Sequence, residues 1–404
     1  MPASADRLFG LSVRFNGVEK PELYNCAEMF RVTEELGQGS TVHLVVMLCR
    51  NDDGSWPHLD AAEFGAWQRI TVTVTVGSIT DVLMDGYISN IEIEQTPQTA
   101  TLRATFTVVD ASYKMGLNPV CKVWPAGKSY EDIARDIITH DPYNLKAVIE
   151  DNPPKAGSDE PRSVVQRSTD RQFLRELARR RGYEFYVMGA TAYFRKPVLS
   201  GTPQKAIASN FGERTNCENL HIYVDATAPT KAVAARIDPY SGETVAVTVD
   251  AASDCGLTKM GTTVANPYPP STIVVRRPPA LSKEELKAYL CGVIIRNSFF
   301  VKATGTLNAL LYGAILRTRK TVKIFGYGKV YTGSYYVRKV VHTLTPKTYR
   351  MEFEAYRNRT GQISPEDSSV LEDPSNSALP LAAGDGADTD VVKVRETGNR
   401  VAPP

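Results

Sequence analysis

Two groups of basic residues in this 404-residue sequence have a spacing that could support binding to anionic groups. Arg175, Arg179 and Arg180 fall in a segment with helical spacing, and Arg175 and Arg179 are four residues apart, on one helix face. We expect this face to be solvated or to form salt bridges between subunits. Contact with DNA that passes through a channel is the alternative interpretation.

A second group of basic residues is interleaved with apolar residues in a segment with strand periodicity. Alternation of this kind places side chains on one face of a sheet, where they could line the lumen of a ring or contact another subunit. Lys320 belongs to this run, and the candidate interface or lumen residues in it are Lys323, Lys329, Arg338 and Lys339.

The sequence contains no converging set of catalytic residues. The five histidines are scattered, without HExxH or HxH spacing. Glu92 and Glu94 are two residues apart in a predicted strand, which is typical of a solvated or interface face rather than of a glycosidase pair. No predicted helix follows Gly326 and Gly328, so they indicate a tight β connection rather than a phosphate loop. We predict no catalytic, cofactor-binding or metal site.

The six cysteines are spread along the chain, and the nearest pair, Cys26 and Cys49, is 23 residues apart. No CxxC pair exists, so the sequence lacks the spacing of a zinc site. We therefore predict reduced thiols in the core rather than a disulfide framework. The remaining cysteines are Cys121, Cys217, Cys255 and Cys291.

Composition and charge argue against several classes of protein. Lys and Arg number 47 and Asp and Glu 45, and the resulting net charge of +2 argues against a dedicated nucleic-acid-binding protein. No apolar run approaches the roughly 18–20 residues of a membrane span, and the N-terminus lacks the pattern of a signal peptide. We therefore expect no membrane insertion, and folding in a cytoplasm.

Residues 1–118 have the period of half-buried strands and predict a first β domain. Residues 70–76 alternate Ile or Val with Thr. Residues 86–94 and 101–109 are two alternating runs around a short link that contains proline, which predicts an antiparallel pair.

Residues 119–200 differ, because helical runs appear there. Ser129 is the predicted N-cap of a helix over residues 130–138, and a second helix is predicted from about residue 168 to 181, ending at Gly182. Two short strands follow. These features predict a small α+β domain inserted between β-rich regions.

Residues 201–360 return to strand periodicity and predict a second β domain, interrupted by a helix near residues 282–297. This helix packs on its own domain or lies at an interface between subunits. Residues 361–404 lack aromatic residues and are rich in Pro, Ser, Asp, Gly and Ala, so they predict a mobile tail. A tail of this kind could tether another tail component.

An internal repeat relates the two β domains. Residues 87–99 align without a gap with residues 336–348, which lie 249 positions later. We infer a duplication, so that a trimer of the chain would present six similar units around its axis. The matched pairs include Tyr87 with Tyr336, Ile91 with Val340, Pro97 with Pro346, Leu102 with Met351 and Ala104 with Phe353.

With these patterns in place, the chain resembles a known family. Residues 164–187 resemble a conserved segment of phage late control protein D and of VgrG spike proteins, and residues 326–358 resemble the C-terminal β domain of that family. The resemblance covers roughly residues 10–360. It implies a mainly β fold with two tube-protein-like β-barrel domains and an α+β insertion, and a pseudo-six-fold ring when trimeric.

The resemblance also implies a function. Members of this family form the baseplate hub of a phage tail or contractile injection system, a homotrimer that joins the hexameric tail tube to the trimeric central spike. The expected partners are the tail tube protein, the central spike protein and baseplate wedge proteins, with the tape-measure protein as a further candidate and DNA only in transit. The expected location is the tail baseplate of a virion or injection particle, assembled in the bacterial cytoplasm.

Two other functions remain as alternatives. The first is a peptidoglycan hydrolase at the tail tip, which requires a reactive carboxylate pair in a cleft. The second is a cell-wall-binding module, because residues 120–150 are faintly similar to a LysM unit.

Overall fold

The structure is a computed structural model. It describes residues 9–56, 59, 61–97, 100–150, 163–237, 242–250, 255, 259–260, 271–276, 278 and 283–361. The predicted mobile tail lies outside these residues, except for Gly361.

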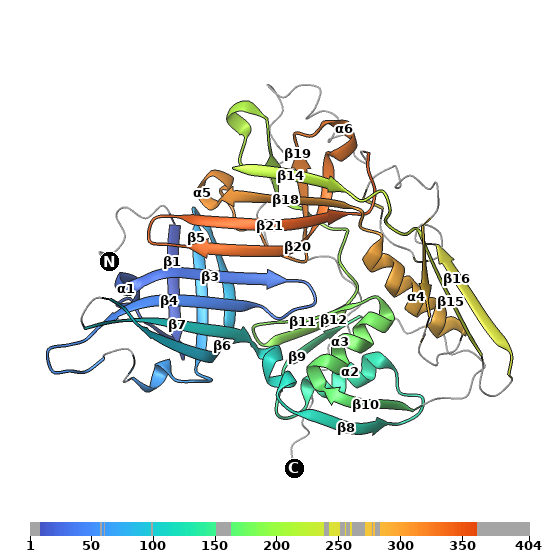
Figure 1. The fold of residues 1–404 in the computed structure, drawn as a ribbon, viewed down its shortest axis with the longest axis horizontal. Helices are drawn as coiled ribbons and strands as arrows, with labels where there is room; N and C mark the ends of the chain where they lie inside the picture. Colours follow the sequence, from blue (N-terminus) through green and yellow to red (C-terminus); the bar gives the residue numbers. More distant parts are fainter. Residues whose placement is uncertain are drawn as a thin grey trace, which may run out of the picture.

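Most strands belong to one 13-stranded sheet that runs through both β-rich regions of the chain (Figure 1). Regular alternation explains the strands: in β5, Ile70, Val72 and Val74 are buried and the threonines between them are partly exposed. The elements before the insertion are β1 (Phe9–Phe15), β2 (Val18–Glu19), α1 (Leu23–Cys26), β3 (Ala27–Glu35), β4 (Thr41–Cys49), η1 (Ala62–Phe64), β5 (Arg69–Val76), β6 (Ile79–Gln95) and β7 (Thr101–Asp110).

The insertion has its own apolar core, built around Phe173, Leu177 and Phe194. Its two predicted helices and two predicted strands are confirmed, and β8 pairs with β10 while β9 pairs with β12. The elements are η2 (Ala111–Gly116), β8 (Pro119–Trp124), α2 (Tyr130–Thr139), β9 (Lys146–Ile149), β10 (Val164–Thr169), α3 (Asp170–Arg181), β11 (Glu184–Met188) and β12 (Thr191–Arg195).

The remaining strands of the large sheet follow the insertion. They share one apolar core with the first region, in which Val13 and Phe106 join Leu307 and Val340. The elements are β13 (Gln204–Ala208), η3 (Gly212–Arg214), β14 (Asn219–Val224), β18 (Val301–Asn308), α5 (Ala309–Tyr312), β19 (Thr321–Phe325), α6 (Gly328–Tyr331), β20 (Gly333–Leu344) and β21 (Tyr349–Arg357).

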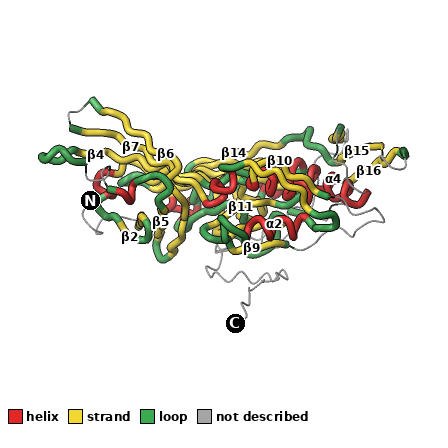
Figure 2. Tube along the Cα trace, turned by 90° about the horizontal axis from the view of Figure 1, so that it is seen from below, coloured by secondary structure: helices red, strands yellow, loops and turns green. Residues whose placement is uncertain are grey.

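A separate three-stranded sheet interrupts the second region between β14 and β18. It packs on α4 through Ala232, Val249 and Leu290, at the end of the molecule opposite β4 and β7 (Figure 2). The hairpin predicted near residues 232–249 is confirmed, but it is not part of the large sheet. The elements are β15 (Lys231–Ile237), β16 (Thr244–Asp250), β17 (Thr272–Val275) and α4 (Lys283–Asn297).

The predicted duplication is visible in the strand order. The first half of the large sheet has the order β3-β4-β7-β6-β5-β1, and the second half has β14-β18-β21-β20-β19-β13. Each strand of the first half therefore has a counterpart in the second half, at the same position in the sheet order and at the same position in the order along the chain. The directions also match, except that β13 runs parallel to β19 whereas β1 runs antiparallel to β5.

Two local irregularities recur at matching positions. A β-bulge interrupts the β6–β7 pairing between Ile88 and Asn90, and another interrupts the β20–β21 pairing between Val337 and Lys339, 249 positions later. A bulge is a specific structural feature, because it adds one unpaired residue and changes the local twist. Its recurrence in the same register supports the duplication independently of residue identity.

The second recurring irregularity precedes β5 and β19. Trp67 and Arg319 both have a φ of 63°, in the left-handed region. The Trp67 N–H donates to the Ile88 carbonyl at 2.7 Å, and the Arg319 N–H donates to the Val337 carbonyl at 2.9 Å. Since non-glycine residues rarely adopt this conformation, the shared geometry is a second mark of common descent for the two halves.

One alignment made from the sequence is wrong by two residues. Gln95 pairs with Leu102, whereas Leu344 pairs with Tyr349, so the first connection is two residues longer. The counterpart of Leu102 is therefore Tyr349 rather than Met351, and Ala104 matches Met351 rather than Phe353. A shift of two keeps every side chain on the same face, so the alternating pattern cannot detect it.

The mainly β fold with an α+β insertion is confirmed. The predicted barrels differ from the observed pairing, because β20 pairs with β3 and joins the two halves into one sheet. Among the described residues, no pairing closes either half into a separate barrel. A four-residue helix, α6, also follows Gly326, contrary to the sequence prediction.

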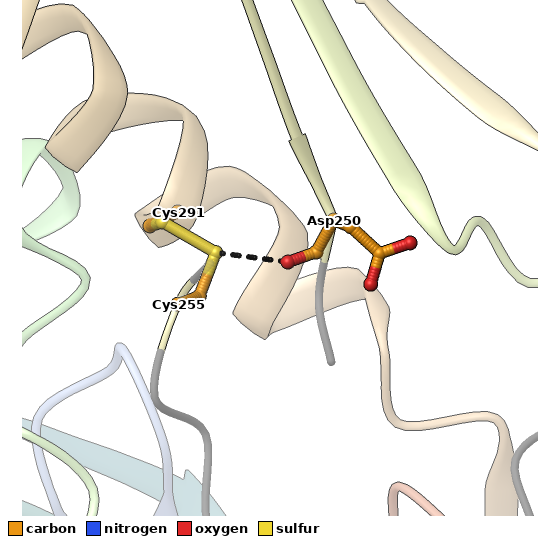
Figure 3. The surroundings of a disulfide bond; sticks show 3 residues. All are labelled: Asp250, Cys255 and Cys291. Carbon is orange, nitrogen blue, oxygen red and sulfur yellow. Dashed lines mark hydrogen bonds between the residues drawn. A yellow bond between two sulfur atoms is a disulfide. The ribbon is translucent and has the colours of Figure 1, made fainter. Parts of the chain in front are cut away.

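The prediction of reduced core cysteines is wrong for most of the six. Cys255 and Cys291 form a disulfide, with their Cα atoms 5.2 Å apart, and Cys49 and Cys121 are exposed. Cys291 projects from α4, and the Cys255 Sγ lies 3.6 Å from the Asp250 carbonyl oxygen (Figure 3). The two cysteines are 36 residues apart in the sequence, and only the packing of α4 on its sheet brings them together.

Candidate functional site: a basic cleft between the sheet and two helices

A cleft of about 1200 Å³, open solvent included, lies where α3 and α4 meet the large sheet. It brings together four of the seven predicted site residues, Arg175, Arg179, Arg338 and Lys339. The other lining residues are Glu35, Leu36, Gly37, Ala178, Gly182, Tyr183, Glu184, Phe185, Pro197, Ile295, Arg296, Phe299, Tyr336, Glu354 and Tyr356.

Helix α3 has strong local signals at both ends. The Thr169 side chain accepts a hydrogen bond from the Gln172 N–H, and Gly182 ends the helix with a φ of 70°. Gly182 also lies against Gly292 of α4, where a Cβ on Gly292 would be 2.7 Å from the Gly182 nitrogen. These two glycines let the helix backbones touch, and this contact fixes the spacing of the cleft wall.

Three arginines on this wall lie close together. The Arg296 guanidinium donates to the Arg179 carbonyl at 3.0 Å. Burial, with a smaller effect of the like charge of Arg171, lowers the pKa of Arg175 to about 10. Burial also lowers the pKa of Arg296, and the charge of Arg179 adds to this effect. The lowered pKa values reflect mainly the burial of these guanidinium groups, and like charges on neighbouring arginines add to the effect.

The opposite wall is formed by β20 and its neighbours. The Arg338 guanidinium carbon lies 4.3 Å from the ring centroid of Phe299 and 4.7 Å from that of Tyr356. Burial lowers the pKa of Arg338. Lys339 forms a 3.2 Å salt bridge with Glu35 of β3. Arg338 is the bulged residue of β20, and the bulge directs this side chain toward the aromatic rings.

The base of the cleft holds a polar pair formed by a buried tyrosine and a half-buried glutamate. The Tyr336 hydroxyl donates to Glu184 at 3.0 Å. Burial raises the pKa of Glu184 and raises the pKa of Tyr336 well above its usual value. The pair links β20 of the large sheet to β11 of the insertion, so its role is to hold the two together. None of the lining residues is Ser, Cys or His, so they offer no nucleophile–histidine pair.

The other three predicted residues are not part of the cleft. Arg180 donates to Glu176 at 2.5 Å and to the Tyr130 hydroxyl, on the α2 side of α3. Lys323 lies on β19 and Lys329 on α6. The predicted helix near residues 282–297 is confirmed as α4, and it packs on the small sheet and on α3.

Sequence reasoning missed Arg296, Glu184 and Tyr336 as cleft residues. Each comes from a different element, and the sequence contains no pattern that brings α3, α4 and β20 together. The matching glycines Gly182 and Gly292 were the one available signal, because small residues mark a close helix contact.

Among the described residues, no three or more His, Cys, Asp or Glu side chains are grouped so that they could hold a metal ion. None of the described helices has the length and apolar character needed to cross a membrane.

Comparison with known proteins identifies structures with a similar fold. No protein-family model and no curated protein matches the sequence significantly. The fold matches a tail protein from Neisseria meningitidis MC58 with a TM-score of 0.61 and 13% identity, over 87% of this chain and 97% of that chain. The 43 kDa tail protein of prophage MuSo2 from Shewanella oneidensis gives a TM-score of 0.59 at 12% identity, over 87% and 98% of the two chains.

A chain of the Francisella PdpA-VgrG complex also matches, with a TM-score of 0.54 at 10% identity, over 88% of this chain and 54% of that chain. The chain therefore has the fold of phage tail proteins and of a VgrG-related component. The resemblance found in the sequence is confirmed at the level of the fold.

Proposed function

We propose that this chain is the structural hub of a phage tail or contractile injection system. In this role, three copies close a ring that joins the hexameric tail tube to the trimeric central spike. The repeat of one strand order within a single chain supports the proposal most directly. Three chains with two similar halves each present six similar units, so one ring can match partners of six-fold and three-fold symmetry.

In this proposal, each predicted domain has its own role. The halves over residues 1–118 and 201–360 form the ring, and the insertion over residues 119–200 decorates it. The hub contacts the tail tube protein on one side and the central spike on the other, with baseplate wedge proteins around it, and DNA crosses its lumen only in transit. The role is geometric and non-enzymatic, and it is carried out in the tail of an assembled particle.

The cleft fits this role as a joint rather than as a DNA clamp. Arg338 packs on two aromatic rings, Lys339 is paired with Glu35, and Arg296 is bonded to the α3 backbone. Side chains held in this way have their charged groups engaged within the protein, and the Arg296 bond joins α4 to helix α3 of the insertion. Tight phosphate contacts would slow DNA passage through a lumen.

The copy number of the chain in purified particles tests the proposal. Quantitative mass spectrometry is expected to give three copies for every six subunits in one ring of the tail tube protein, and particles that lack the gene are expected to lack attached spikes. A ratio incompatible with three contradicts the ring.

Zymography on peptidoglycan tests the alternative of a hydrolase, and a pull-down with peptidoglycan tests the alternative of a wall-binding module. Hydrolytic activity or retention on peptidoglycan would contradict the hub.

A further inference from the structure

The two halves differ in whether one strand edge is covered. Residues 339–344 of β20 pair with residues 30–35 of β3, within the same chain. The matching part of β6, residues 90–95, pairs with β7 on one side, and among the described residues it has no strand on the other side. In the same part of the chain, β14, the counterpart of β3, pairs only with β18.

The pairings define the counterparts residue by residue. A set of residues that are paired directly across four neighbouring strands of the first half matches such a set in the second half, because the strands follow in the same order. We call each set a row. Val32 therefore corresponds to Ile222. The first row is Val32, Val42, Val108 and Ile88, and the second is Ile222, Ala303, Ala355 and Val337.

Side-chain exposure differs sharply between the covered and the open edges. At the covered junction, Val340 and Val32 are fully buried. Their counterparts at the open edges are not: Ile91 is 37% exposed, and Ile222 is only partly buried against the core. Ile93, the counterpart of the buried His342, is 50% exposed. Exposed isoleucines that face the core side of a sheet indicate a missing neighbour.

The backbone groups at the two open edges are also complementary. The Asp225 N–H donates to Phe300 on the β18 side, so by alternation the backbone groups of Val224 and Ile222 point outward. At the covered junction, the Leu36 N–H donates to the Arg338 carbonyl, which directs the backbone groups of alternate β20 residues toward β3. The same geometry in β6 directs those of Ile91 and Ile93 outward.

We propose that residues 90–93 of one chain pair, antiparallel, with residues 222–225 of a second copy. This inference rests on the proposed ring and names the contact that closes it. Carrying over the β20–β3 register places Ile91 opposite Val224 and Ile93 opposite Ile222, so that apolar residues meet on the core side. The contact is head-to-tail, because each chain presents one edge of each kind, and such a contact closes a ring when the rotation between successive copies is one third of a turn.

The opposite face of the ladder is polar and also complementary. Glu92 lies opposite Tyr223, which pairs with Lys302 on β18. Lys302 forms a 2.8 Å salt bridge with Glu354, so the incoming carboxylate would share this cation. The ladder ends near residue 221, because the Leu220 carbonyl already accepts a hydrogen bond from the Tyr327 hydroxyl. The short length suits a joint that needs a matched neighbour and resists open-ended edge pairing.

Disulfide trapping tests this register. Glu92→Cys and Tyr223→Cys occupy a pair without direct backbone hydrogen bonds, where side chains lie closest across strands. Both sites are exposed, so folding is retained, and the exposed Cys49 and Cys121 are replaced by serine. Mild oxidation of the full chain is expected to give covalent rings of three chains. The control pairs Glu92→Cys with His221→Cys, two residues out of register on the same face, and is expected to cross-link at least tenfold less.

The outcomes separate the two proposals. A trimer by native mass spectrometry that cross-links no better than the control overturns the edge pairing and leaves the ring intact. A chain that neither assembles nor cross-links at the highest concentration reached also overturns the edge pairing, whereas the ring is judged separately by its copy number in particles. Ile93→Lys is expected to weaken assembly at least tenfold, because it charges the centre of the contact, whereas Val165→Lys, on the separate β8–β10 sheet, is expected to leave it unchanged.

Discussion

The first and second halves of the large sheet share the strand order, the position of a β-bulge and a residue with left-handed backbone geometry. They differ in the segments that connect their strands. The second half carries a helix and three strands between β14 and β18, where the first half has only the short loop of residues 36–40 between β3 and β4. The shared features define the framework of the sheet, and the differences lie in the connections and at one sheet edge. Duplication therefore preserved backbone pairing and left loops free to diverge.

The reversal of β13 is the clearest difference. Because β13 runs parallel to β19, the chain ends β19 at Phe325 and turns at Gly326, whereas the counterpart β5 continues to Val76. Gly326 has a φ of +112°, and a Cβ there would lie 1.8 Å from the Ser209 carbonyl oxygen. The absence of a side chain at Gly326 thus lets the turn after β19 pass close to the backbone at the end of β13.

The largest expected effect comes from giving Gly326 the residue of its first-half counterpart, Val74. Gly326→Val is expected to lower the free energy of unfolding by about 4 kcal/mol or more, because both the backbone angle and the contact with Ser209 exclude a side chain. Urea unfolding measures the change. Gly328→Ala is the control, since its φ is also positive but open space surrounds it, and a loss of only about 1 kcal/mol is expected. Equal losses would contradict the account.

The second prediction concerns a buried ion pair at the covered junction between β20 and β3. Arg317 bonds Glu34 at 2.9 Å, both are buried, and the counterpart of Glu34 is Val224. Arg317→Met is expected to cost about 3 to 5 kcal/mol, because it leaves a buried carboxylate without its partner. The double variant Glu34→Leu with Arg317→Met is expected to recover most of the loss. If the double variant is as unstable as the single one, the cause is packing rather than charge.

The third prediction uses His342, whose counterpart is Ile93. Burial lowers the pKa of His342 to about 4. Between pH 6.5 and pH 4 the unfolded chain binds a proton at this residue and the folded chain does not, so stability falls as the pH is lowered through this range. The expected loss between pH 7 and pH 5 is about 2 kcal/mol.

The pH dependence is checked with two variants. His342→Leu is expected to remove this loss from the urea unfolding profile, whatever its effect on stability at pH 7. His43→Gln, at an exposed position of β4, is expected to leave the loss in place. An unchanged slope in His342→Leu would assign the pH dependence to another group.

The smallest expected effect lies in the longer of the two connections. Ala100 directly precedes β7 and has a φ of 63°. It lies in the connection between β6 and β7, which is two residues longer than the matching connection in the second half. Ala100→Gly is expected to raise the free energy of unfolding by about 0.5 kcal/mol, because glycine adopts this conformation without a steric penalty. Ala126→Gly, at an exposed turn with negative φ, is expected to lower it instead. Thermal unfolding of the two variants side by side resolves the opposite signs.

Some parts of the fold were predictable because the signals are local. The Ser129 side chain caps α2 by accepting from the Asp132 N–H, and Gly182 ends α3, both as the sequence indicated. The strand at residues 70–76 follows its own alternation. The offset between the β7 and β21 registers was not predictable, since loop length and strand pattern leave shifts of two residues equivalent.

The candidate site was predictable only in part. The four-residue spacing of Arg175 and Arg179 correctly placed both on one helix face that lines the cleft. The same spacing argument could not show that Arg180 turns toward Glu176, or that Arg296 joins the cleft from α4. Likewise, Cys255 and Cys291 carry no motif, and their disulfide depends on how α4 packs.

The sequence alone determined most of the long strands and helices and indicated that one unit occurs twice, because periodicity and capping act over a few residues and leave a direct record in residue order. The tertiary structure decided that β20 joins β3 within the chain and that β13 runs in the opposite sense. It also decided that no described strand covers one edge of residues 90–95. These depend on pairings between segments far apart in the chain. The backbone N–H and C=O groups that form such pairings are nearly the same in every residue, so the sequence does not show which strand pairs with which.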